Sequence, residues 1–252
     1  MSDSGPVLPG GLPRPRFRRR LARIHRTALW QRLFHWRQLD IEYALWQMLY
    51  LVVSPSRVYR NIYYHKQTKN QWARDDPSFM LLQVVGILVV TAAYSVVYGV
   101  GVAGFGRATV GLLGVNYLAM GVLMATLTWT VANRWMARRG GAHVSEQRVE
   151  WMFALDVHCN AFFMLFVPAY VVQFCFLPVV MRTSWMSLVV GNTLFAVAAA
   201  GYVYATYLGL HALPFLQRQE AVLYAIPVVA VAYLWTLAVG FNVSHHVIDY
   251  YF

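Results

Sequence analysis

Long stretches without any charged residue recur five times along the chain and dominate its pattern. They contain 30, 26, 25, 35 and 28 residues and cover positions 77–106, 108–133, 157–181, 183–217 and 221–248. A helix needs about 20 apolar residues to cross the roughly 30 Å hydrocarbon layer of a bilayer. The pattern therefore predicts an all-α integral membrane protein with five transmembrane helices. We place these spans at about 80–103, 108–132, 160–181, 185–208 and 221–242, in a bundle that covers residues 80–252.

The first 37 residues are polar and basic. Residues 1–15 contain seven glycines and prolines and are predicted to be a disordered lead-in. Residues 16–37 favour a basic amphipathic helix, because apolar residues recur on one face at helical spacing. That face carries Phe17, Leu21, Ile24 and Ala28. The arginines that we expect at a membrane surface, in an arm of the chain, are Arg16, Arg18, Arg19, Arg20, Arg23 and Arg26.

Residues 43–53 form an apolar and aromatic run of eleven residues that Ser54 and Pro55 bring to an end. Apolar runs of about 10–14 residues are too short to cross a bilayer, and they more often lie in the interface or pack on a bundle. We therefore predict a juxtamembrane interfacial segment here. Together with the basic helix it forms a cytosolic region that covers residues 16–79.

Composition supports a membrane protein, and the charges predict its orientation. Hydrophobic residues make up 59% of the chain and charged residues 12%, against about 25% charged residues in soluble domains. In the predicted topology, nineteen of the 21 lysines and arginines share the side of the N-terminus, whereas Arg107 and Arg182 lie on the other side. Basic residues concentrate on the cytosolic side of membrane proteins. We therefore expect a cytosolic N-terminus and a lumenal C-terminus.

A polar group near the start of the third predicted span is a candidate for chemistry. Asp156, His158, Cys159 and Asn160 carry atoms that can ligate metals. Residues two positions apart on a helix do not face each other, so Asp156 and Asn160 share a face that His158 does not. No zinc motif supplies further ligands. We therefore expect no metal and no cofactor, and we interpret the group as polar residues that face the bundle interior at its cytosolic rim.

The residues just before the first span have a structural interpretation as well. Asp76 and Pro77 fit the N-cap and first position of a helix, and two carboxylates favour the positive end of its dipole. A role in binding a partner is compatible with this capping role. Arg74, Asp75 and Asp76 therefore remain candidates for docking.

Amides inside the spans either form hydrogen bonds between helices or line a path for a solute. Asn192 lies in the fourth predicted span and Asn116 in the second. A transporter that uses Asn116, Asn160 and Asn192 is thus an alternative, weakened because no Lys, Arg, Asp or Glu lies deep in any predicted span. Neither a nucleophile paired with a base nor a phosphate-binding glycine loop is visible, so we do not expect an enzyme.

Six stretches carry a resemblance to a known family. Three precede the first span, namely ALWQMLY at 44–50, SPSRVYRN at 54–61 and KQTKNQWARDDPSF at 66–79. Three are shorter, namely DVHCNAF at 156–162, GNTL at 191–194 and ALPFL at 212–216. The chain resembles the uncoordinated-50 family of Golgi membrane proteins over about residues 36–245.

The resemblance implies a five-span Golgi protein with a cytosolic N-terminus that acts in vesicle trafficking without known catalysis. It implies a link to the large brefeldin-sensitive exchange factors that activate Arf GTPases, and to the surface delivery of nicotinic-type receptors. RNA binding has also been ascribed to a member. It assigns no role to the matched polar positions Arg74, Asp75, Asp76, Asp156, His158, Asn160 and Asn192.

Four hypotheses follow. The leading one is a non-enzymatic Golgi scaffold that helps recruit a large Arf guanine-nucleotide exchange factor and supports surface delivery of receptors. The alternatives are a membrane chaperone or cargo receptor for oligomeric receptors, a small-solute or lipid transporter, and RNA binding by the arm, which phosphate contacts would make non-specific. Arginines and aromatic residues are enriched in interface hot spots, which favours residues 44–79 for docking. The docking candidates there are Arg57, Arg60, Tyr63, Arg74, Asp75 and Asp76.

The arm yields a direct prediction. A peptide of residues 14–37 should bind anionic vesicles and gain helical circular dichroism there, because each basic residue near an anionic leaflet contributes about 1 kcal/mol. Binding should weaken as added salt shortens the Debye length, which is about 10 Å at 0.1 M. Equal binding to neutral vesicles would contradict the electrostatic basis. Tight binding to one RNA sequence at physiological salt would favour the RNA hypothesis instead.

Overall fold

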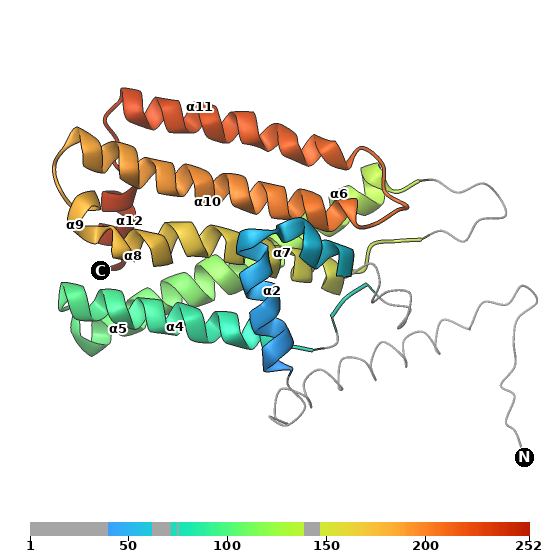
Figure 1. The fold of residues 1–252 in the computed structure, drawn as a ribbon, viewed down its shortest axis with the longest axis horizontal. Coiled ribbons are helices and arrows are strands. Elements are labelled where there is room, and N and C mark those ends of the chain that lie inside the picture. The colour runs from blue at the N-terminus through green and yellow to red at the C-terminus, as the bar shows by residue number, and fades with distance from the viewer. Residues whose placement is uncertain (1–39, 62–71, 75, 139–146) are drawn as a thin grey trace, which may run out of the picture.

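The computed structural model describes residues 40–61, 72–74, 76–138 and 147–252. The predicted arm, Tyr63 and Asp75 lie outside these described residues. Within them, five helices are long and apolar enough to cross a membrane, and they run side by side as a bundle (Figure 1). These helices are Ser78–Tyr98, Gly101–Met136, Trp151–Cys175, Trp185–His211 and Gln219–Ala238. The predicted fold class, an all-α protein with five spans, is confirmed.

Several of the spans are built from more than one helical segment. The first is α4 (Ser78–Tyr98), and the second comprises α5 (Gly101–Thr109), η2 (Val110–Ala119), α6 (Met120–Val131) and η3 (Ala132–Met136). The third comprises α7 (Trp151–Phe166), η4 (Val167–Val172) and α8 (Gln173–Cys175). The fourth is α10 (Trp185–His211), and the fifth comprises η5 (Gln219–Tyr224) and α11 (Ala225–Ala238). Shorter helices are α2 (Ile41–Val53), α9 (Leu177–Val180) and α12 (Val243–Tyr251).

The turn between the first two spans comes earlier than the sequence predicted. We expected it around Arg107, because that residue interrupts the uncharged run. In the structure α4 ends at Tyr98, and Gly99 and Gly101 make the turn with φ of 64° and 66°. These left-handed values favour glycine, which ends helices for this reason. Arg107 is an exposed residue of α5, and a long basic side chain near a helix end can reach the headgroups without ending the helix.

The third span begins nine residues before the expected position 160. The uncharged run had excluded Asp156, yet this residue lies inside α7 with only 8% of its surface exposed. A carboxylate can lie inside a helical bundle when donors satisfy its oxygens. The backbone N–H of Arg74 donates to Asp156 Oδ2 at 2.7 Å and provides one such donor.

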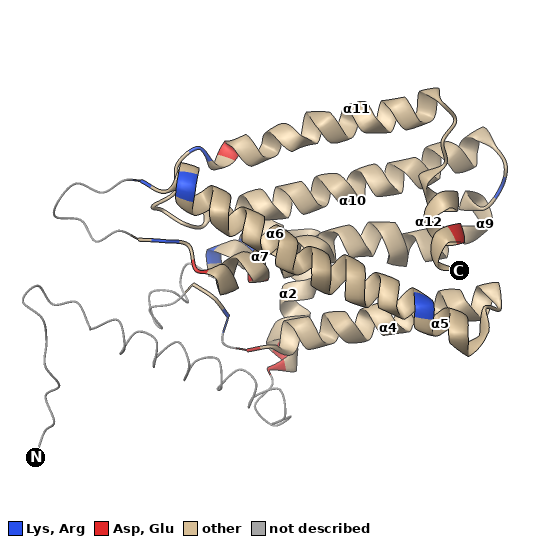
Figure 2. Cartoon of the chain, turned by 180° about the vertical axis from the view of Figure 1, so that it is seen from behind, with Lys and Arg blue, Asp and Glu red and all other residues tan. Residues whose placement is uncertain are grey.

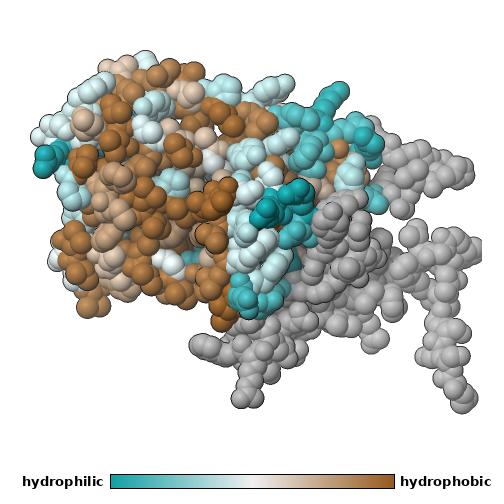
Figure 3. All heavy atoms as spheres, viewed as in Figure 1, coloured by the Kyte–Doolittle hydropathy of each residue, from teal (hydrophilic) through white to brown (hydrophobic). Residues whose placement is uncertain are grey.

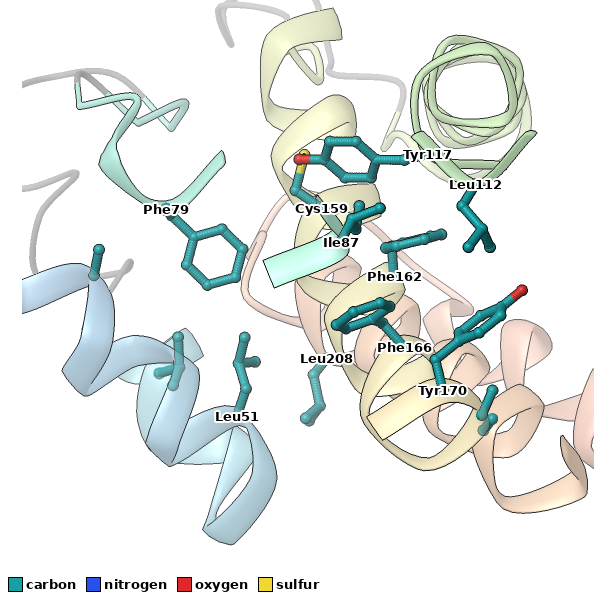
Figure 4. Packing of buried hydrophobic residues seen from close by; sticks show 14 of the residues in the cluster. Leu51, Phe79, Ile87, Leu112, Tyr117, Cys159, Phe162, Phe166, Tyr170 and Leu208 are labelled. Carbon is teal, nitrogen blue, oxygen red and sulfur yellow. The ribbon is translucent and has the colours of Figure 1, made fainter. Parts of the chain in front are cut away.

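Helix α7 is the centre of the bundle. Two of its rings, Phe162 and Phe166, lie among residues from α2, α4, η2 and α10 (Figure 4). Tyr170 of the following η4 belongs to the same cluster. Small residues bring α10 close to it, as the spacing of Gly201, Ala205 and Gly209 predicts. A Cβ added to Gly209 would lie 2.6 Å from Val157 Cγ2, so any larger residue there would force the two helices apart.

After α11 the chain turns at Gly240 and returns to the bundle as α12. The hydroxyl of Tyr251 accepts a hydrogen bond at 2.7 Å from Asn116 in η2. The ring of Phe252 stacks on Tyr94 of α4 at a centroid distance of 5.1 Å. Residues 243–252, which the sequence left as a short lumenal tail, therefore tie the second and first spans together at one end of the bundle (Figure 1).

Helix α2 runs across the direction of the spans beside the start of α4, in the half of the bundle away from α12 (Figures 1 and 2). Its buried residues Ala44, Gln47 and Leu51 face the bundle, whereas Leu45 and Leu49 are 54% and 62% exposed. A helix that lies across the spans and exposes leucines is suited to the membrane interface. The interfacial position predicted for the segment stays a prediction.

The charged residues gather at the α2 end of the bundle (Figure 2). Of the nine arginines that the structure describes, seven lie at this end, which we call the basic end: Arg57, Arg60, Arg74, Arg134, Arg138, Arg148 and Arg218. Arg107 and Arg182 lie toward the other end, which we call the far end. The folded bundle thus retains the charge asymmetry on which the predicted orientation rests, and a cytosolic basic end stays a prediction.

The orientation is testable with single cysteines at exposed turns. Gln217→Cys at the basic end and Thr183→Cys at the far end should be placed in a Cys175→Ala background, since Cys175 is exposed and Cys159 is buried. In sealed vesicles with the cytosolic side outward, a membrane-impermeant maleimide should label position 217 at once. It should label position 183 only after detergent is added. The reverse pattern would show that the bundle is inserted the other way round.

Candidate functional site

Asp76 connects the starts of two helices. Its Oδ1 accepts hydrogen bonds from the backbone N–H and hydroxyl of Ser78 at 3.0 and 2.6 Å, at the first turn of α4. Its Oδ2 accepts from the backbone N–H of Asp40 at 2.9 Å. Asp40 in turn caps α2 by accepting from Tyr43 N at 3.0 Å. The N-cap of α4 is Pro77 rather than Asp76 as predicted, yet the Asp76 carboxylate accepts from Ser78 in the first turn and also joins the start of α2 to that of α4.

Arg74 connects this junction to α7. Its backbone N–H donates to Asp156, and its guanidinium Nη2 donates to the side-chain oxygen of Asn160. The same guanidinium lies over the ring of Phe79 at 4.3 Å, in a cation–π contact. Arg74 thus joins Asp156 and Asn160 by hydrogen bonds, and Asp76 lies two residues from Arg74 along the chain. We call these four residues the rim cluster.

Several hydrogen-bond donors in and beside the rim cluster are not matched by an acceptor among the described residues. Tyr59 Oη, Asn160 Nδ2, and Arg74 Nε and Nη1 are buried and have no hydrogen-bond partner in the described part of the chain. Burial raises the pKa of the Tyr59 phenol above its ordinary value, so the hydroxyl keeps its proton and remains a donor. The chemistry that the cluster offers is thus hydrogen-bond donation.

His158 lies on a different face of α7 from Asp156 and Asn160, as the two-residue spacing requires. Its Nε2 is 3.2 Å from the carbonyl oxygen of Tyr117, which can only accept, so Nε2 carries a proton. Its Nδ1 lies 2.8 Å from the hydroxyl of Tyr202. In the neutral imidazole this hydroxyl donates to Nδ1. His158 therefore joins α7 to the second and fourth spans rather than to the rim cluster.

Asn192 is far from the rim cluster, near the other end of α10. Its Nδ2 donates to Thr236 Oγ1 at 3.1 Å and to the Phe241 carbonyl at 2.8 Å. Its Oδ1 accepts from the backbone N–H of Val243 at 2.9 Å. All of these partners lie at the junction of α11 and α12, so Asn192 holds the returning C-terminal helix in place.

The docking candidates divide into buried and exposed groups. Arg57 and Arg60 are exposed on residues 55–61, a helical segment that follows α2. Val58 and Tyr59 of the same segment are buried, with 0% and 4% exposure. The Arg57 guanidinium lies over the ring of Tyr50 at 4.8 Å, which orients it on the surface. We call residues 40–61 the platform.

Surface hydropathy separates the two ends of the molecule. Apolar residues cover the bundle from the far end, and hydrophilic residues gather toward the basic end (Figure 3). The platform lies where the two surfaces meet. Among the described residues, no group of three or more His, Cys, Asp or Glu side chains could hold a metal ion.

Sequence reasoning missed several partners of the predicted residues. Asp40 donates its backbone N–H to Asp76, Tyr59 is buried beside Arg74 and Asn160, and Tyr117 and Tyr202 enclose His158. Asp40 carried a local signal, because an aspartate directly before an apolar run is a typical N-cap. The tyrosines carried none, since their roles depend on contacts between residues more than 40 positions apart.

The chain matches a single family along most of its length. The sequence profile of the UNC-50 family matches residues 29–252. The chain belongs to the UNC-50 family. It is 40% identical to the human protein unc-50 homolog over 222 residues, which are 88% of this chain and 85% of that protein. It is 39% identical to the Dictyostelium discoideum protein unc-50 homolog over 223 residues, which are 88% of this chain and 85% of that protein. It is 38% identical to Caenorhabditis elegans protein unc-50 over 222 residues, which are 88% of this chain and 72% of that protein.

No solved structure matches the chain at a significant level. The family resemblance drawn from six short stretches is confirmed, and UNC-50 similarity extends beyond residues 36–245 in both directions. At the C-terminal side it takes in α12, the helix that the sequence did not predict.

The rim cluster yields a stability prediction. Arg74→Met should lower the free energy of unfolding by about 2 kcal/mol, because Asn160 loses a charge-assisted hydrogen bond and Phe79 its cation. Thermal unfolding of the purified protein in detergent measures this. Arg138→Met, which removes an exposed arginine at the same end, should change the stability by less than about 0.5 kcal/mol. Equal effects of the two substitutions would show that Arg74 contributes only as a surface charge.

Proposed function

We propose that the protein is a non-enzymatic Golgi membrane scaffold that helps recruit a large Arf guanine-nucleotide exchange factor and supports the surface delivery of membrane receptors. The observation that carries the proposal is the platform. It is fixed to the bundle by the rim cluster and by buried Leu51 and Val58, yet it leaves Arg57 and Arg60 exposed. A surface presented in one fixed geometry loses little conformational freedom when a partner binds.

Family membership supports the choice of partner. The stretches that most resemble the UNC-50 family, 44–50 and 54–61, form the two helices of the platform, and the stretch 66–79 contains Arg74 and Asp76 of the rim cluster. Arginines beside aromatic rings are typical anchors of protein interfaces. Arg57 over Tyr50 is such a pair on the platform surface.

The fifth span favours one alternative, a membrane chaperone or cargo receptor for oligomeric receptors. Helix α11 buries none of its residues and lies along α10 at the edge of the bundle (Figure 1). Val228, Val231, Leu234 and Trp235 are between 62% and 68% exposed. Such a helix could pack against a transmembrane helix of a cargo protein. In that case substitutions on α11, rather than on the platform, would abolish function.

Charge reversal on the platform tests the leading proposal. Tagged Arg57→Glu and Arg57→Glu/Arg60→Glu variants should be expressed in cells that lack the endogenous protein. Both should remain folded and reach the Golgi. Recovery of the exchange factor with the double variant should fall about tenfold, the loss expected when hot-spot arginines are reversed.

The matched control is Arg138→Glu/Arg218→Glu, which makes the same charge change at two exposed positions of the basic end outside the platform. It should recover the exchange factor as well as the unsubstituted protein does. If the platform variant also retains full recovery, docking on the platform is excluded. If both double variants lose recovery equally, net charge rather than the platform recruits the partner.

A further inference from the structure

A cavity of about 560 Å³ opens beside the platform, where residues 55–61 approach the last turns of α10. This volume lies within the usual range for small-molecule sites, about 300–1,000 Å³. The platform contributes Ser56 and Arg60 to its lining, and α10 contributes Tyr204, Tyr207, Leu208 and His211. Tyr59 of the platform lines the cavity as well and lies beside the rim cluster, whereas the other lining residues do not belong to that cluster.

The lining suits an anionic ligand that accepts hydrogen bonds. Among the lining residues, Arg60 carries a guanidinium, His211 an imidazole, and Ser56, Tyr204 and Tyr207 hydroxyls, and none carries a carboxylate. An arginine fork binds two oxygens of a phosphate at once. His211 is exposed, and its ring stacks on Tyr207 at a centroid distance of 5.3 Å, so the two lie as one wall of the cavity.

The position of the cavity indicates that its ligand comes from the bilayer. The cavity lies where α10 ends at the basic end, at the level where tyrosines concentrate at membrane interfaces. Helix α2 ends directly before the cavity-lining segment, and its last residues Val52 and Val53 are 54% and 71% exposed. Apolar residues are thus displayed beside basic and hydroxyl groups. A lipid with an anionic head and apolar chains has the same arrangement.

We infer that this cavity binds the phosphate headgroup of an anionic glycerophospholipid. Arg60 holds the phosphate, the tyrosine and serine hydroxyls donate to its oxygens, and Leu208 meets the first methylenes of the acyl chains. Basic pockets beside transmembrane helices on the cytosolic side are the kind of site that such headgroups occupy. The inference rests on the cavity and does not depend on recruitment of the exchange factor.

Native mass spectrometry of the purified full chain in neutral detergent tests the site. The probes are dioleoylphosphatidic acid, dioleoylphosphatidylcholine and inorganic phosphate. One phosphatidic acid molecule should bind at least about tenfold more tightly than phosphatidylcholine, whose headgroup has no net charge. Arg60→Gln should weaken phosphatidic acid binding about tenfold, the loss expected when one charge-assisted hydrogen bond is removed.

Arg138→Gln and Arg182→Gln each remove one exposed positive charge outside the cavity, and both should leave the affinity within twofold. A second variant, Ser56→Ala/Tyr207→Phe, keeps every charge and ring and should still weaken binding severalfold. Equal losses for Arg60→Gln and Arg138→Gln would overturn the site in favour of general surface attraction. Competition by millimolar inorganic phosphate would overturn the assignment to a lipid, and equal binding of phosphatidylcholine would overturn its anionic character.

Lipid binding at the cavity and docking of the exchange factor on the platform can be tested separately. Lipid binding is measured on the protein alone, without exchange factor. Docking is measured for this comparison with Arg57→Glu alone, which should already lower recovery of the exchange factor, because Arg57 does not line the cavity whereas Arg60 of the double variant does. Loss of lipid binding with retained recovery of the exchange factor, or the reverse, would therefore assign each effect to its own surface.

Discussion

The hydrogen bonds of Arg74 hold together a structure whose other parts are mostly apolar and could slide past one another. Helix α2 and residues 55–61 lie across the spans, and apolar contacts alone fix neither their position along the bundle nor their rotation. The backbone N–H of Asp40, directly before α2, donates to Asp76, and Arg74, two residues before Asp76, donates to Asp156 and Asn160 of α7. Such bonds are strong at the edge of a low-dielectric region, and leaving any partner unpaired there is costly. They fix the start of the platform relative to α4 and α7.

Much of the fold could be predicted because lipid imposes a simple rule on the sequence. Uncharged runs longer than 20 residues identified all five spans. The same rule placed two boundaries incorrectly, for different reasons. Arg107 lies in a helix because its side chain can reach the headgroups, and Asp156 lies in one because Arg74 satisfies it. A charged residue thus marks the end of a span only where, inside the span, its side chain would reach neither the headgroups nor a hydrogen-bonding partner.

The candidate site was predictable only where spacing along one helix decides the outcome. The shared face of Asp156 and Asn160, and the separate face of His158, follow from 3.6 residues per turn. Their partners could not be predicted, because Arg74 is more than 80 residues away from both in sequence and Tyr202 is 44 residues from His158. The return of α12 was missed because its nine residues carry polar side chains whose partners, Asn116 and Gln173, lie on other spans.

We expect the rim cluster to hold the platform against the bundle. Hydrogen–deuterium exchange of the full chain in detergent tests it by comparing the unsubstituted protein with Arg74→Met and Asp76→Ala. Local opening energies are read directly from such exchange. If the rim cluster holds the platform, both substitutions should speed exchange of the α2 amides at least about tenfold and leave exchange of the amides in the middle of α10 unchanged. Unchanged exchange in α2, or an equal rise in α2 and α10, would contradict it.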